Sequence, residues 1–192
     1  GTLVVTNDHV LPEKLDEARR ETIAVFSGRG RTATRHTARV LARDPKHDLA
    51  ILGIAGALPA MRLAGNDTVR EGADIAFTGF PLGMLLGLYP VTHQGIVAAI
   101  SPFVPPQRGA RDLSASMIRA MREPYDVLQL DATAYPGNSG SPVYDPVTAQ
   151  VVGVINSVFI KGKKEAAVST PSGITYAIPV RFVRQLLSTI DQ

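Results

Sequence analysis

The sequence contains no cysteine among its 192 residues, and no apolar run approaches the length of a membrane span. The missing cysteines exclude a disulfide framework and a cysteine nucleophile. A helix that crosses a bilayer needs about 20 consecutive apolar residues, so no transmembrane helix is predicted. The apolar run at 2–6 is too short for the core of a signal peptide, and we expect any export signal to lie upstream or to have been removed.

The charge is also nearly balanced. The formal net charge is only +3, and although the sequence pI is about 9.4, no run of five like charges occurs. A nucleic-acid-binding stripe is therefore not predicted. The zinc motif H-E-x-x-H and clusters of cysteine and histidine are missing as well, so we predict no catalytic metal and no cofactor.

What the sequence has is a succession of short β-branched, apolar segments separated by glycine and proline. This pattern favours an all-β fold of barrels over a parallel sheet. Four strands are expected before residue 72 and six after it: 2–6, 21–27, 33–42, 49–54, 73–79, 92–100, 126–130, 142–144, 151–160 and 173–178.

Two segments depart from this rhythm. Residues 180–190 carry an apolar face at helical spacing after Pro179, which predicts a C-terminal helix. Residues 101–124 form a proline-bounded insert in which 112–121 are expected to be helical, either packed on the barrel surface or acting as a lid or sensor. One or two helical turns are also expected within 12–20.

The stretch 134–142 reads A-Y-P-G-N-S-G-S-P and surrounds Ser139 with turn-forming residues. Gly137 and Gly140 allow backbone conformations that a side chain would block. Such a turn can present a serine hydroxyl beside backbone N–H groups, which suits a nucleophile and an oxyanion hole. Taken alone, the stretch favours an ordinary turn between two strands, and only the rest of the chain points to a nucleophile.

A serine nucleophile needs a base and a group that orients the base. All four histidines precede Ser139, which excludes the order found in α/β-hydrolases, where the histidine follows the serine. His9 ends one apolar run and Asp48 opens another, so the order His, Asp, Ser remains available. His36 and His93 are interpreted as surface or interface residues, and His47 as pointing away from Asp48.

The segments around His9, Asp48 and Ser139 resemble those of the trypsin-like serine peptidases, and in particular of their HtrA/Deg branch. Residues 5–10, V-T-N-D-H-V, are similar to the family's V-T-N-x-H-V. Residues 44–52, D-P-K-H-D-L-A-I-L, resemble D-P-x-x-D-L-A-[VIL]-L, and residues 136–142 resemble P-G-N-S-G-[GS]-P. Weaker similarities follow in family order at 79–83, 95–97 and 176–179.

The resemblance implies a catalytic triad of His9, Asp48 and Ser139 that hydrolyses peptide bonds through an acyl-enzyme. It also implies an oxyanion hole from the backbone N–H groups of Gly137 and Ser139, with Asn138 as a further candidate. Asn138 stands where trypsin-type zymogens carry an aspartate that pairs with a new N-terminus. A neutral side chain cannot form that pair, so loop ordering is the expected form of control.

By the same resemblance, Thr133 lies at the base of the substrate pocket, and Asn156, Ser157 and Val158 supply the strand that pairs with substrate. Thr133 and its neighbours carry no carboxylate, so a basic substrate side chain would meet no counter-charge. Val158 replaces a glycine of broad-pocket relatives and would narrow the pocket. Small or medium apolar side chains are therefore expected at the position before the cleaved bond.

The implied fold is a trypsin-like double β-barrel with a C-terminal helix. Residues 1–72 would form the half that carries His9 and Asp48, and residues 73–192 the half that carries Ser139. By this resemblance the first barrel would lack its two N-terminal strands, which would leave an apolar, uncharged edge at 2–6. We expect the natural protein to continue upstream by roughly 20 to 30 residues, or a neighbouring molecule to supply these strands.

The expected function is a serine endopeptidase that cleaves unfolded or extended polypeptides, located in the periplasm or secreted. Two alternatives stay open: a catalytically silent peptide-binding scaffold, and an esterase-like acyl hydrolase. The expected partners are polypeptide substrates, with no nucleic acid and no membrane span, and homo-oligomer formation is left open.

Overall fold

The computed structural model describes residues 1–65, 69–81, 87–103, 123–156 and 174–190. The predicted all-β fold is confirmed, with four strands in a first sheet and six in a closed barrel. The strands are β1 (Leu3–Thr6), β2 (Ile23–Ser27), β3 (Thr34–Asp44), β4 (Leu49–Ile54), β5 (Asp74–Gly79), β6 (Val91–Pro102), β7 (Asp126–Asp131), β8 (Pro142–Tyr144), β9 (Val151–Asn156) and β10 (Ile174–Pro179).

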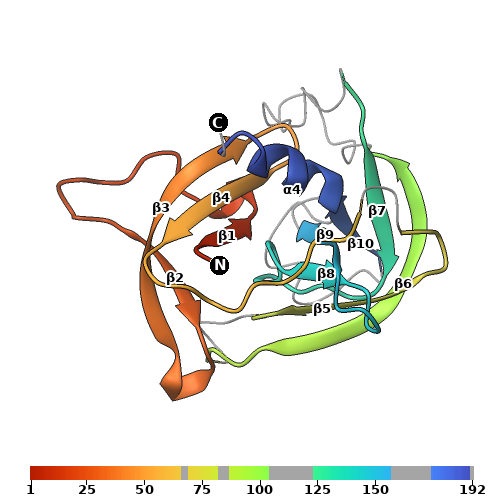
Figure 1. The fold of residues 1–192 in the computed structure, drawn as a ribbon, viewed down its shortest axis with the longest axis horizontal. Helices are drawn as coiled ribbons and strands as arrows, with labels where there is room; N and C mark the ends of the chain where they lie inside the picture. Colours follow the sequence, from red (N-terminus) through yellow and green to blue (C-terminus); the bar gives the residue numbers. More distant parts are fainter. Residues whose placement is uncertain (66–68, 82–86, 104–122, 157–173, 191–192) are drawn as a thin grey trace.

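The six later strands close into an antiparallel barrel in the order β10-β7-β6-β5-β8-β9, seen on the right of Figure 1. Closure pairs every strand on both sides and removes exposed edges. The interior is filled by fully buried apolar side chains such as Phe77, Val97, Leu130 and Ile155. A register shift in β6 between Val97 and Ala99 marks a bulge, a feature that bends barrel strands.

The four earlier strands form an open antiparallel sheet in the order β1-β4-β3-β2. In it, β4 is the central buried strand, because Leu49, Ala50 and Ile51 are completely inaccessible to solvent. Among the described strands, β1 pairs only with β4 and β2 only with β3, so these two are the edges of the sheet.

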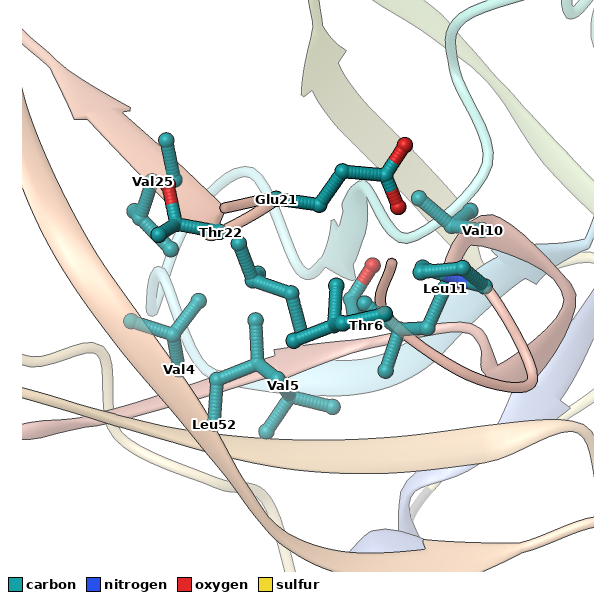
Figure 2. Close-up of a pocket in the computed structure, with 13 residues that line it drawn as sticks. Val4, Val5, Thr6, Val10, Leu11, Glu21, Thr22, Val25 and Leu52 are labelled. Carbon is teal, nitrogen blue, oxygen red and sulfur yellow. The ribbon is translucent and has the colours of Figure 1, made fainter. Parts of the chain in front are cut away.

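An apolar groove of about 730 Å³ lies between the two edge strands. Figure 2 shows Val4 and Val5 of β1 and Val25 of β2 around it, together with Glu21. It is lined by Val4, Val5, Thr6, Val10, Leu11, Pro12, Leu15, Glu21, Thr22, Ile23, Ala24, Val25 and Leu52. The edge of the sheet thus borders an apolar surface, as the uncharged segment at 2–6 predicts.

The C-terminal helix α4 (Val180–Leu187) packs against strands of both sheets and lies across the top of Figure 1. It ends three residues earlier than predicted. The Ser188 hydroxyl donates a hydrogen bond to the carbonyl of Gln185, and the Thr189 hydroxyl to that of Leu186. Such side-chain bonds compete with helical backbone bonds and end the regular ladder.

The connector between the sheets is fastened to α4. The Arg184 guanidinium donates hydrogen bonds of 2.9 Å to the carbonyl oxygens of Leu63 and Ala64. Leu63 also forms a β-bridge with Val151 of the barrel. Within the described part of the chain, no helix has the length and apolar character that crossing a bilayer requires.

Two local predictions have different outcomes. The predicted helical turns within 12–20 are wrong, because this stretch forms non-helical turns, while a short 3₁₀ helix, η1 (Asp8–Val10), occurs instead just after β1. The predicted helix at 112–121 and most of the insert at 101–124 lie outside the described residues.

Candidate functional site

The imidazole of His9 stands at the end of β1, in the short helix η1. The β3 residue Arg43 braces this helix by donating hydrogen bonds to Asp8 Oδ1, at 3.0 Å, and to the Pro12 carbonyl, at 2.7 Å. Burial raises the pKa of the Asp8 carboxyl, although the Arg43 guanidinium opposes this effect. The segment that carries His9 is therefore attached to the sheet on both sides of the histidine.

Asp48 binds His9 with both of its carboxylate oxygens. Its Oδ2 lies 2.6 Å from His9 Nδ1, and its Oδ1 accepts the backbone N–H of His9 at 2.8 Å. The His9 side chain remains 31% exposed whereas that of Asp48 is only 14% exposed, so the imidazole faces solvent and the carboxylate lies behind it. This geometry fixes the ring and leaves Nε2 directed away from Asp48.

Asp48 itself is held from two directions. Its backbone adopts a left-handed conformation with φ of +53°, unusual for a residue with a side chain. The amide of the buried Asn7 donates to the Asp48 carbonyl at 3.0 Å. The amide of Asn156, from β9 of the barrel, donates to Asp48 Oδ2 at 2.6 Å. The carboxylate therefore bridges the first sheet and the barrel.

The turn before Ser139 uses the backbone freedom of Gly137 that the sequence predicts. The N–H of Asn138 donates to the Tyr135 carbonyl at 3.0 Å, and Gly137 has φ of +99°. With Pro136 and Gly137 at the two central positions, these features define a type II turn, which needs a positive φ at its second central residue. Because the turn uses the N–H of Asn138, that group is not available as an oxyanion donor in this conformation.

The residue after Ser139 places the loop against the end of β1. Gly140 has φ of +84°, and a Cβ atom there would lie 2.7 Å from Thr6 Oγ1 and 3.5 Å from the Asn7 nitrogen. Its N–H donates to the Ile155 carbonyl of β9 at 3.0 Å. The backbone at Gly140 therefore packs directly on the segment that leads into His9, and the structure brings the three predicted triad segments to one junction.

Gly79, at the end of β5, allows a second close approach. A Cβ atom there would lie 2.1 Å from Ser141 Oγ and 2.7 Å from Asn138 Oδ1. The side chain of Asn138 is fully buried, and its amide atoms have no hydrogen-bond partner among the described residues. Asn138 and Ser141, on either side of Ser139, are therefore buried against the barrel, while Ser139 itself stays partly accessible to solvent.

The predicted pocket residues are only partly described. Thr133 follows β7 and is half-buried, and the loop beside it is fastened by the buried Thr175 of β10. The Thr175 hydroxyl accepts the N–H of Ala134 at 3.0 Å and donates to the Ala132 carbonyl at 2.6 Å. Ser157 and Val158 lie outside the described residues.

Of the three remaining histidines, His36 and His47 agree with the sequence-based interpretation and His93 does not. His36 bonds to Ser27 at 2.8 Å near an edge of the sheet, and His47 pairs with Asp44 rather than Asp48. His93 is not a plain surface residue: its ring stacks on Phe77 with centroids 4.7 Å apart, and its Nε2 atom is buried. Burial lowers the pKa of His93.

Sequence reasoning missed the residues that hold Asp48 and the serine loop. Asn7 lies inside the motif at 5–10, and this position is the only feature of the sequence that points to a role for it. Asn156 was expected to contribute to substrate pairing, yet its side chain binds Asp48, a contact between residues 108 positions apart that no local pattern announces. Within the described ranges, no three His, Cys, Asp or Glu side chains gather closely enough to hold a metal ion.

The chain is similar to known serine peptidases over almost its whole length. The family model described as "Trypsin-like peptidase domain" matches residues 1–154. The serine protease PepD of Mycobacterium tuberculosis is 31% identical over 97% of this chain, and a probable periplasmic serine endoprotease, DegP-like, of Chlamydia trachomatis is 27% identical over the same share. The chain spans only 39% and 31% of these two relatives.

Among solved structures, the HtrA-type protease AlgW bound to a decapeptide superimposes with a TM-score of 0.68 and 28% identity. The match covers 98% of this chain and 48% of that one. It confirms the predicted double-barrel fold. The chain therefore belongs to the trypsin-like peptidase family, and its relatives are HtrA- and DegP-like serine proteases.

Proposed function

We propose that this domain is a serine endopeptidase in which Ser139, His9 and Asp48 form the catalytic triad. The observation that supports this most directly is the double contact of Asp48 with the ring and the backbone of His9, at 2.6 and 2.8 Å. A carboxylate placed behind a partly exposed imidazole is the orienting contact that a serine triad requires, and Gly140 packs the loop of Ser139 against the segment that leads into His9.

In the proposed reaction, His9 Nδ1–H donates to Asp48, which leaves Nε2 as the proton acceptor. Nε2 takes the Ser139 hydroxyl proton as the oxygen attacks the scissile carbonyl, and gives it to the departing amine, which leaves an acyl-enzyme. Water then attacks the acyl carbon while Nε2 takes its proton and returns it to the Ser139 oxygen, so the carboxylic acid is released and the serine is restored. Asp48 fixes this tautomer and stabilises the imidazolium. Its second donor, Asn156, keeps the carboxylate oriented.

The developing oxyanion would be stabilised by the backbone N–H groups of Gly137 and Ser139. The type II turn favours this pair over Asn138, whose N–H donates to Tyr135. Each such donor typically contributes roughly 3 to 4 kcal/mol to transition-state stabilisation. The site would therefore accelerate peptide hydrolysis without a metal or another cofactor.

We propose extended or unfolded polypeptides as substrates, paired with the strand at Asn156, Ser157 and Val158 and with a small or medium apolar side chain near Thr133. The AlgW structure contains a decapeptide, which supports a peptide ligand for the fold. The name of the chlamydial relative also supports a periplasmic location.

The test is mass spectrometry of a reduced, unfolded protein after incubation with the wild type and with Ser139→Ala. We expect peptide fragments only with the wild type, since loss of one turn hydroxyl leaves the fold intact. Labelling of Ser139 by an organophosphorus fluoride without cleavage of protein would point to an esterase-like hydrolase. No labelling and no cleavage would point to a binding scaffold, and fragments from Ser139→Ala would refute the nucleophile.

A further inference from the structure

The turn that presents Asp48 is built around the side chain of Asp44. Asp44 Oδ1 accepts the backbone N–H groups of Lys46 and His47, at 3.1 and 3.2 Å, and its Oδ2 lies 2.5 Å from His47 Nδ1. These contacts define residues 44–48 as one small unit. The left-handed backbone of Asp48 ends this unit, and such a conformation persists only where the surroundings hold it.

The imidazole of His47 carries this unit across to the other half of the molecule. Its ring stacks on Phe182 of α4, with centroids 3.8 Å apart and planes 17° apart, and meets the Tyr125 ring edge-on at 4.7 Å. His47 is only 9% exposed. Both aromatic partners belong to the part of the chain that carries the barrel, whereas His47 belongs to the open sheet.

The partners are themselves fixed in place. The rings of Tyr125 and Phe182 contact each other edge-on, with centroids 5.4 Å apart, and the Tyr125 carbonyl accepts the N–H of Phe103 at 2.9 Å. Lys46, within the turn, forms an ion pair with Glu123, two residues before Tyr125. The turn before Asp48 therefore packs on the two contacting rings of Tyr125 and Phe182, while the bond from Asn156 reaches Asp48 from β9.

We infer that His47 is a positioning residue for the reaction: through Asp44 on one side and Phe182 and Tyr125 on the other, it sets where Asp48 lies relative to the barrel that carries Ser139. This inference rests on the proposed peptidase function. The serine and the His–Asp pair come from different sheets, so their alignment depends on contacts between the halves. His47 provides such a contact one residue from Asp48.

Two variants divide the role of the ring. His47→Asn places an amide nitrogen near the position of Nδ1 and keeps the bond to Asp44 but removes the stacking. His47→Phe keeps the stacking and removes the bond. His47→Ala removes both, and Phe182→Leu removes the stacking partner without altering the first sheet. His36→Ala is the matched control, because the His36 ring bonds to Ser27 of the neighbouring strand within the first sheet.

With a peptide substrate, we expect His47→Ala to lower kcat by roughly ten- to a hundredfold with little change in KM, the size of effect that a small misplacement produces. His47→Asn and His47→Phe should each recover part of the loss, and His36→Ala should match the wild type. Melting temperatures identify the folded variants. The inference would be overturned if kcat is unchanged in folded His47→Asn and Phe182→Leu. It would also be overturned if kcat falls across the variants only in proportion to their melting temperatures.

A second measurement separates this inference from the proposed function. In a Ser139→Ala background, the proton between His9 Nδ1 and Asp48 is followed by ¹H NMR with and without the His47 substitutions. We expect this resonance to broaden or shift in His47→Ala and to be retained in His36→Ala. An inactive wild type refutes the function but leaves this test valid, and an unchanged resonance in folded His47→Ala refutes the positioning role.

Discussion

Gly140 offers the sharpest test of how the two halves meet. Replacing it with alanine introduces two separate penalties. The residue has φ of +84°, where a side chain costs roughly 1–2 kcal/mol. The new Cβ would also lie 2.7 Å from Thr6 Oγ1 and 3.3 Å from Thr6 Cα. Rotation of the hydroxyl can relieve the first contact, whereas the contact with the backbone carbon is relieved only when the serine loop and the end of β1 move slightly apart.

The second penalty falls on the proposed triad. Movement at Gly140 shifts the adjacent Ser139 away from the segment that carries His9, and misplacement by about 1 Å can cost 10²-fold in rate. We therefore expect Gly140→Ala to lower kcat/KM about ten- to a hundredfold, beyond its effect on stability. Urea unfolding and initial rates with a peptide substrate measure the two effects independently.

Gly56 supplies a control with the same backbone strain and no clash. It also has φ of +84°, but a Cβ atom there meets nothing within 4 Å. Gly56→Ala should lose a similar roughly 1–2 kcal/mol of stability and keep its activity. Adding Thr6→Ala to Gly140→Ala should restore part of the rate. If Gly140→Ala and Gly56→Ala have equal kcat/KM, the packing argument is wrong.

Three further predictions follow from single contacts. Asn156→Ala removes a hydrogen bond to a carboxylate, worth roughly 1.5–3 kcal/mol, and should lower kcat/KM about tenfold or more with the fold preserved by circular dichroism. Burial lowers the pKa of His93 from its ordinary 6.5, so the unfolded chain binds a proton at this group more readily than the folded chain does. The free energy of unfolding therefore contains the full contribution of neutral His93 above pH 6.5 and loses it as the pH falls below that value. Urea titrations at pH 7.5 and 5.5 should therefore show a smaller drop in His93→Gln than in the wild type, and an equal drop would contradict the assignment. Gly95→Ala would place a Cβ atom 2.1 Å from the Asp131 carbonyl, a backbone atom that cannot yield, so we expect insoluble or unfolded protein, and a wild-type melting curve would show that the barrel adapts.

The strand pattern was predictable because β-branched runs and glycine or proline punctuation are local features. The strand starting at Leu49 and the turn at Pro136 and Gly137 follow directly from their residues. Hydroxyl bonding by Ser188 and Thr189 shortened the helix, a competition that the apolar periodicity does not express.

The site was predictable only as far as its motifs extend. His9, Asp48 and Ser139 stand in recognisable stretches, and Asp48 does meet His9. The contacts of Asn156 and His47 with their partners depend on how two sheets pack against each other. Such contacts join residues more than a hundred positions apart, or a turn to a helix at the far end of the chain, and no short window of sequence contains both sides.

The proposed triad is divided between an open sheet, which carries His9 and Asp48, and a closed barrel, which carries Ser139. These two units should differ in the free energy that local unfolding requires. The segment before His9 belongs to an edge strand bonded on one side, whereas Ser139 follows strands of a closed barrel. Local opening needs less free energy where fewer bonds must break, so amide protons of β1 should exchange with solvent faster than those of β9. Partial denaturation would then separate His9 from Ser139 while the barrel is still folded. Catalysis in this domain would be limited by the stability of its weaker half.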